Sequence, residues 1–137
     1  MESRDRILEI LQPKEWKNPS GYSNGIKVKG ELIFVAGQVG WDENCEIISD
    51  NLMEQIRQCL LNIVKILEEG KAEPKHIVRL TWYLTNLNEY RTVAKEVGTI
   101  YREVIGKHYP AMSLFQVSAL LEEGAKVEIE ATAVLPS

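Results

Sequence analysis

The chain has 137 residues, of which 45% are hydrophobic and 26% are charged, and its formal net charge is −4. That length and balance fit a single globular domain with a buried core and exclude an intrinsically disordered chain. No apolar run reaches the roughly 18 residues of a membrane span, the charged N-terminus is unlike a signal peptide, and the acidic balance disfavours nucleic acid, so we expect neither a membrane nor a nucleic-acid partner.

The N-terminal segment combines a short amphipathic pattern with a stretch rich in turn formers. Residues 3–11 predict a short amphipathic helix that ends near Pro13. The sequence Asn-Pro-Ser-Gly at residues 18–21 is the clearest break in the stretch after this helix, and it indicates a linker or an extended lead-in.

Two short strands are predicted within residues 26–40, around Lys29-Gly30. The segment from Leu32 to Ala36 is nearly all apolar, which predicts a buried strand. Gly37 and Gly40 permit a close backbone approach or a bend at the end of that strand.

A helix is predicted between Asn51 and Gly70. Asn51 and Glu54 have the spacing of a capping box, Gly70 stands where a helix-ending glycine belongs, and Pro74 blocks any continuation. The apolar residues recur with the spacing of one wide buried face: Leu52, Ile56, Cys59, Leu60, Ile63, Val64 and Leu67.

The second half of the chain predicts a strand, a helix and two more strands. The run 76–86 has the composition of a strand, and alternation separates Val78, Leu80, Trp82 and Leu84 from Ile77, Arg79, Thr81 and Tyr83. A second helix is predicted from a cap at Asn88 to Gly106, with the stripe Tyr90, Val93, Ala94, Val97, Ile100, Tyr101 and Val104. Strands are predicted for residues 110–118 and 126–135.

This order predicts an α+β fold, with a mixed sheet of five or six strands and two helices on one face. Val127, Ile129, Ala131 and Ala133 are expected to face the helices. The other face is expected to carry Arg79, Thr81, Tyr83, Met112, Leu114, Gln116, Glu128, Glu130 and Thr132. Because this face is partly apolar, we expect a homo-oligomer that buries it.

The carboxylates of Glu128 and Glu130 are the main candidates for chemistry. They share one face of a predicted strand and lie about 7 Å apart by the strand rise. One interpretation is a carboxylate that orients water or transfers a proton. The other, which the residue types favour, is an ion pair across the interface between subunits, with Arg79 or Lys126 as the candidate cation.

No cofactor or metal is indicated by the motifs. Residues 37–40 lack the spacing of a dinucleotide-binding loop. Cys45 and Cys59 form no CxxC pair and no Cys/His cluster, so no zinc site is expected. Thiols this sparse suit a reducing compartment, and we expect a cytoplasmic protein.

Several segments in this order resemble the Rid/YjgF family, the reactive intermediate deaminases. The segments are GYSNGIKVKGELIFVAGQVG near the start, the strand IVRLTWYLTNLNEY, the stretch YPAMSLFQVSAL and the closing KVEIEATAV. The resemblance covers about residues 18–135. We therefore expect residues 1–17 to be an N-terminal extension with a short helix and residues 18–137 to form the Rid/YjgF-like domain.

The resemblance implies a chorismate-mutase-like fold and a homotrimer whose sheets form a central β-barrel, with clefts for a small-molecule ligand between subunits. Active members of the family hydrolyse enamines and imines made from amino acids and release ammonia, without a metal or an organic cofactor. Their cleft uses an arginine that binds the substrate carboxylate and a glutamate that positions water.

Carried over by position, the family's cleft is only partly present in this chain. Glu128 matches the family glutamate, while Tyr22, Gly37 and Gln38 match cleft-forming positions. Active members read Pro-Ala-Arg-Ser-Cys where this chain has residues 110–114, so Met112 replaces the arginine and Leu114 replaces the cysteine.

The loss of that arginine changes the expected ligand. A guanidinium binds a carboxylate through two charge-assisted hydrogen bonds, and a buried carboxylate without that partner would lose roughly 2–5 kcal/mol, about 30- to 4000-fold in affinity. Three hypotheses remain: a deaminase-like cleft for a neutral or apolar ligand beside Met112 and Leu114, a substitute charge from Arg79, or a non-catalytic binding or interaction trimer. A ribonuclease or translation inhibitor, a label that the family carries, is disfavoured by the acidic charge.

Overall fold

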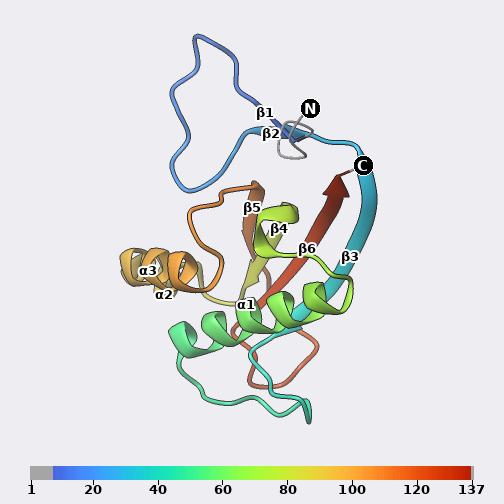
Figure 1. Cartoon of the computed structure of the whole chain (residues 1–137). Helices are drawn as coiled ribbons and strands as arrows, with labels where there is room; N and C mark the ends of the chain where they lie inside the picture. The colour runs from blue at the N-terminus through green and yellow to red at the C-terminus, as the bar shows by residue number, and fades with distance from the viewer. Residues whose placement is uncertain (1–7, 137) are drawn as a thin grey trace.

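The fold is built around a four-stranded mixed sheet (Figure 1). The computed structural model describes residues 8–136. Its sheet contains β3 (Gly30–Val39), β4 (Ile77–Leu84), β5 (Ala111–Gln116) and β6 (Val127–Pro136). The order is β3-β6-β4-β5, in which β4 and β5 are parallel and the other neighbours antiparallel. The predicted α+β class and mixed sheet are confirmed, but the sheet has four strands rather than five or six.

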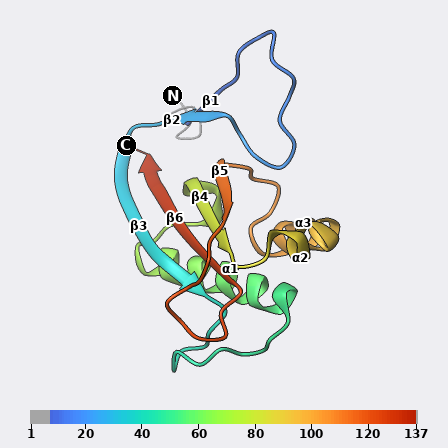
Figure 2. The ribbon, with the colours of Figure 1, turned by 180° about the vertical axis from the view of Figure 1, so that it is seen from behind.

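The helices cover one face of this sheet and leave the other uncovered, as the view from behind shows (Figure 2). Helix α1 (Leu52–Glu69) begins at the predicted cap, where the Asn51 side chain accepts a 3.0 Å hydrogen bond from the Glu54 N–H. Its predicted apolar stripe forms the centre of the core, with Val64 only half-buried. No helix within residues 8–136 is long and apolar enough to cross a membrane.

The second predicted helix is in fact two helices. Helix α2 (Leu87–Thr92) is capped by Asn86 rather than by Asn88, and helix α3 (Ala94–Val104) follows after a break at Val93. The Asn86 side chain accepts a 3.0 Å hydrogen bond from the Glu89 N–H. Most of the predicted stripe still packs against the core: Val97, Ile100 and Tyr101 are buried, and Tyr90, Val93 and Val104 are partly buried against it. Ala94, which the prediction placed in the stripe, is exposed.

A bulge in β4 reverses the faces that were predicted for its first two side chains, Ile77 and Val78. Ile77 pairs with Ala133 but Arg79 pairs with Thr132, so the register shifts by one residue between them. Ile77 is therefore fully buried in the core, whereas the prediction placed Val78 on that side. Beyond the bulge, Leu80, Trp82 and Leu84 are buried as predicted.

The prediction of a buried strand at Leu32–Ala36 was wrong for one face of β3. Leu32 and Phe34 are 62% and 75% exposed, while Val35, next to Phe34, is 3% exposed. The strand is at the edge of a sheet that helices cover on one side only, so alternate apolar side chains stay uncovered. The apolar side chains of Leu32 and Phe34 thus lie on the open face.

The N-terminal region forms a small separate sheet instead of the predicted helix. Strand β1 (Glu9–Leu11) pairs antiparallel with β2 (Gly25–Lys27), and an extended loop joins them at the edge of the molecule (Figure 1). Residues 3–7 of the predicted helix lie outside the described residues. The predicted division into two strands around Lys29-Gly30 is confirmed, since β2 ends at Lys27 and β3 begins at Gly30.

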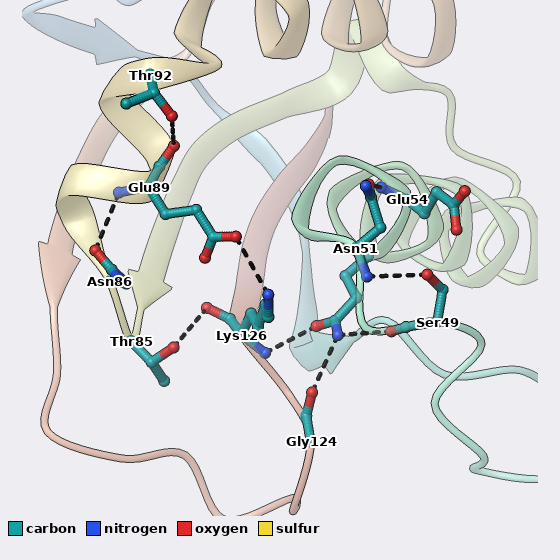
Figure 3. Close-up of polar contacts among 10 residues, drawn as sticks. Ser49, Asn51, Glu54, Thr85, Asn86, Glu89, Thr92, Gly124 and Lys126 are labelled. Carbon is teal, nitrogen blue, oxygen red and sulfur yellow. Dashed lines mark hydrogen bonds and ion pairs between the residues drawn. The ribbon is translucent and has the colours of Figure 1, made fainter.

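One buried glutamine, Gln55, binds the loops at the end of the sheet where β6 begins, and Figure 3 labels its partners Ser49, Gly124 and Lys126. Gln55 of α1 is fully buried, and its amide donates to the carbonyl oxygens of Ser49 at 2.8 Å and Gly124 at 3.0 Å. Its carbonyl oxygen accepts a 2.8 Å hydrogen bond from the Lys126 N–H. Gly40 permits the close approach predicted for it, since a Cβ there would lie 2.7 Å from the Gln55 Cα.

We expect Gln55→Met to lower the free energy of unfolding by about 2–4 kcal/mol, because buried backbone groups would lose their partners while the volume is kept. Urea unfolding followed by tryptophan fluorescence, at fixed protein concentration, measures this loss. Gln58→Met on the same helix is the control, since Gln58 makes only a partly exposed hydrogen bond to Asn62. Equal midpoints for the two variants would contradict the role given to Gln55.

Candidate functional site

The predicted site residues lie on both faces of the sheet. In the register of the sheet, Met112 pairs with Leu80 and Leu114 with Trp82, so both side chains point to the helix-covered face. Glu128 pairs with Tyr83 on the open face. The prediction that Met112, Leu114 and Gln116 share the open face with Glu128 was therefore wrong.

Met112, Leu114 and Tyr22 do lie together, around a cavity of about 840 Å³ between β5, the helices α2 and α3, and the N-terminal loop. The loop is anchored there by Ser23, whose N–H donates to the Pro110 carbonyl oxygen at 3.0 Å and whose hydroxyl donates to that of Tyr109. The complete lining is Pro19, Ser20, Gly21, Tyr22, Trp82, Tyr90, Ala94, Lys95, Val97, Gly98, Tyr101, Arg102, Tyr109, Met112, Ser113 and Leu114.

Aromatic side chains make up much of this cavity wall, and the sequence pattern did not reveal that role. Tyr90 packs edge-on to Trp82 at 6.4 Å between ring centroids, and Tyr101 stacks on Tyr109 at 5.7 Å. Tyr101 donates a 2.6 Å hydrogen bond to the carbonyl oxygen of His108, and burial raises the pKa of its phenol. Their helical and strand spacing indicates core positions only, and the cavity arises where that core meets the N-terminal loop.

Trp82, which also lines the cavity, has a buried indole N–H without a hydrogen-bond partner among the described residues. The residue as a whole is 3% exposed. A buried N–H without an acceptor costs free energy, so native proteins rarely leave one unpaired.

On the open face, Glu128 lies against a glycine in a bulge of β3. The register between β3 and β6 shifts between Val35 and Gln38, and this brings Gly37 directly over the Glu128 carboxylate. A Cβ at position 37 would overlap that carboxylate, so only glycine leaves room for it. The predicted close approach at Gly37 is thus confirmed, and its neighbour is Glu128.

Gln38 lies neither at the cavity beside Met112 nor at the contact between Gly37 and Glu128. Its side-chain amide donates a 3.1 Å hydrogen bond to the Ala36 carbonyl oxygen, and the residue lines a hollow of about 540 Å³ beside α1. Trp41 and Asn62 line the same hollow, where the Asn62 amide donates to the Trp41 carbonyl oxygen at 3.0 Å.

Arg79 is exposed on the open face, in a hollow of about 420 Å³ that Phe34, Thr81 and Glu130 also line. It lies on the face opposite to Met112, and its guanidinium makes no ion pair within 4.0 Å in residues 8–136. Within one chain Arg79 thus pairs with neither Glu128 nor Glu130, and the ion pair predicted across the subunit interface stays a prediction. Lys126, the other predicted partner of the acidic pair, binds Glu89 at 3.2 Å instead.

Glu130 has a tyrosine as its partner. The Tyr83 hydroxyl donates a 2.9 Å hydrogen bond to a Glu130 carboxylate oxygen, and Tyr83 stacks on Phe115 at 6.2 Å between centroids. This hydrogen bond is the main reason why the pKa of the Tyr83 phenol is raised, followed by desolvation and by the negative charges of Glu130 and Glu128.

The described part of the chain contains no group of three or more His, Cys, Asp or Glu side chains that could hold a metal ion. Cys59 is fully buried against β6, and desolvation raises the pKa of its thiol. Cys45 is exposed on the loop after β3.

Comparison with known proteins gives a consistent result. Residues 14–135 match the family model for endoribonuclease L-PSP. A RutC family protein of Pyrococcus abyssi is 36% identical over 127 residues, which cover 91% of this chain and 95% of that protein. The human 2-iminobutanoate/2-iminopropanoate deaminase is 31% identical over 114 residues, covering 82% of this chain and 79% of the human protein. A crystal structure of a Rid-family protein of unknown function from Yersinia pestis has a TM-score of 0.80 at 30% identity, covering 94% and 99% of the two chains.

The Tyr83–Glu130 contact predicts a measurable change in titration. Glu130→Gln removes the charged acceptor, so the pKa of Tyr83 should fall toward the usual value of about 10. Because the pKa is raised in the folded state, this contact stabilises the fold below pH about 10, and its contribution is lost as the pH rises through the folded-state pKa. NMR titration of ¹³C-labelled tyrosine measures the shift, and Glu128→Gln should produce a smaller one. An unchanged pKa in Glu130→Gln would show that this contact does not exist in solution.

Proposed function

The chain belongs to the Rid/YjgF family, and from this membership we propose that it is a homotrimeric, deaminase-like hydrolase of imines or enamines. The resemblance to a deaminase of 2-imino acids supports the reaction class. The observation that carries the proposal is the position of Glu128, whose carboxylate is kept on the open face beneath the one glycine that leaves it room.

The chemistry proposed for Glu128 needs only a carboxylate and water. The carboxylate accepts a proton from a water molecule while the water oxygen attacks the C=N carbon. The proton is then delivered to nitrogen, which gives a carbinolamine. Transfer of the carbinolamine's hydroxyl proton to its amino nitrogen lets the C–N bond break, and ammonia and a carbonyl compound are released. Every atom in this step comes from the imine and the water, so the reaction requires no cofactor.

We propose the homotrimer because one chain leaves the two halves of the cleft apart. Met112 and Tyr22 lie at the cavity on the helix-covered face, and Glu128 lies on the open face, two strands away. A cleft between two copies can bring the cavity of one beside the Glu128 of the other. The open face also carries Leu32, Phe34 and Phe115, which are more than half exposed and which a central barrel of three sheets would cover.

Phe34→Glu tests this assembly, since it would place a charge in the proposed barrel. We expect the trimer to dissociate at least tenfold more readily, because a buried charge without a partner is strongly unfavourable. Sedimentation velocity over a range of concentrations measures this, with Ile66→Glu on the outer side of α1 as the control. A wild-type chain that sediments as a monomer would refute the proposed trimer.

The substrate of this hydrolase is proposed to differ from the small imino acids of the deaminase relatives. Met112 has no charge and no hydrogen-bond donor with which to hold a carboxylate beside the reacting carbon. The cavity it lines is rich in aromatic side chains and suits a larger apolar body. A non-catalytic binding trimer is the alternative that the same replacement favours.

Nothing in the described surface favours an endoribonuclease. The net charge of −4 opposes RNA binding, which depends on many phosphate contacts. We therefore propose no nucleic-acid substrate.

Ammonia release from 2-iminobutanoate tests the hydrolase and its specificity together. We expect Met112→Arg to raise kcat/KM by about 30-fold or more, because it restores a charge-assisted pair with the carboxylate, while Met112→Gln gives no such gain. Glu128→Gln in the Met112→Arg background should lower the rate about 100-fold, the usual scale of a general base. A wild-type rate equal to that of Met112→Arg would contradict the role assigned to Met112, and full activity of Glu128→Gln would contradict the mechanism.

A further inference from the structure

We infer that the cavity beside β5 takes an anionic ligand with an apolar or aromatic body, whose negative group is bound by Lys95 and Arg102 of α3. The inference rests on the proposed function, because it names the ligand class of that same cleft. It assigns the charge recognition to the helix wall of the cavity rather than to the strand that carries Met112.

The charges that line the cavity carry this inference. Among the described residues, Lys95 and Arg102 are its only ionisable side chains apart from the tyrosines, and no Asp or Glu lines it. Within residues 8–136, neither of them makes an ion pair within 4.0 Å. Two unpaired positive charges at one cavity are notable in a chain whose net charge is −4, since acidic side chains outnumber basic ones in its sequence.

The sequence of α3 places these two cations on one side of the helix. Lys95, Gly98 and Arg102 follow the spacing i, i+3 and i+7, and all three line the cavity. A Cβ at Gly98 would lie only 3.3 Å from an Arg102 guanidinium nitrogen, so the absence of a side chain there lets the guanidinium lie across the helix surface. This guanidinium is only weakly held, by a long hydrogen bond of 3.5 Å to the Thr99 hydroxyl.

The uncharged residues that line the cavity determine which kind of ligand body fits it. Tyr22 and Tyr90 offer aromatic surface, and Met112 and Leu114 add flexible and branched apolar surface. A volume of about 840 Å³ is within the usual range of small-molecule sites. A compact imino acid would fill little of this space, whereas an aryl-alkyl carboxylate can contact the apolar strand wall while its charge reaches α3.

A matched pair of probes tests the inference by isothermal titration calorimetry on the full-length protein. The probes are 3-phenylpropanoate and 3-phenylpropanamide, which share a body and differ in charge. We expect the anion to bind about tenfold more tightly at low salt, and about threefold of that preference to disappear with each of Lys95→Gln and Arg102→Gln. The preference should vanish in the double variant and weaken in 0.5 M salt. Lys107→Gln is the charge-matched control, because Lys107 is exposed and does not line the cavity.

The results separate this inference from the proposed function. Equal binding of the two probes, no binding of either, or an equal loss of preference in Lys107→Gln would overturn the inference. If the anion preference is found but no imine releases ammonia, only the proposed hydrolase fails, because the titration does not depend on turnover. If ammonia is released but the amide binds as tightly as the anion, only the ligand class fails.

Discussion

The register of β6 between β3 and β4 is the constraint on which the rest of the molecule depends. Alternation along β6 from Val127 to Ala133 sends Val127 and Ile129 into the core and Glu128 and Glu130 to the open face. A slip of one residue would bury both carboxylates against α1 and expose the apolar row, which would cost several kcal/mol. Because α1 also binds the start of β6 through Gln55, the helix layer and the carboxylates are positioned by one set of contacts.

The sequence predicts which face of a strand is buried only where the apolar residues gather on one of its two faces. In β6 the apolar residues occupy alternate positions, so the face of Glu128 followed directly from the pattern. In β5 the apolar Met112 and Leu114 alternate with Ala111 and Phe115, so neither face is marked as interior. Only the parallel pairing with β4 decides between them, and that is a tertiary contact which the local sequence does not encode.

The other errors have a similar physical origin. The bulges in β3 and β4 add a residue without changing the composition of the strand, and each reverses the faces on one side of it. Asn86 and Asn88 are both residues of the type that caps helices, and α2 begins after the first. The cavity was missed because its aromatic lining has the periodicity of a core, and the N-terminal loop that closes it lies far away in the sequence.

The sheet separates the residue proposed for water activation from the residues proposed for ligand recognition. Met112 lies on β5, with β4 between it and β6, and it points to the opposite face from Glu128. A change at position 112 therefore leaves the contact between Glu128 and Gly37 intact. Binding specificity can change on one face while the carboxylate on the other face keeps its position. For this reason Met112, which the family resemblance places where active members have an arginine, argues for a different ligand more strongly than for a loss of catalysis, and the unpaired cations of α3 fit that interpretation.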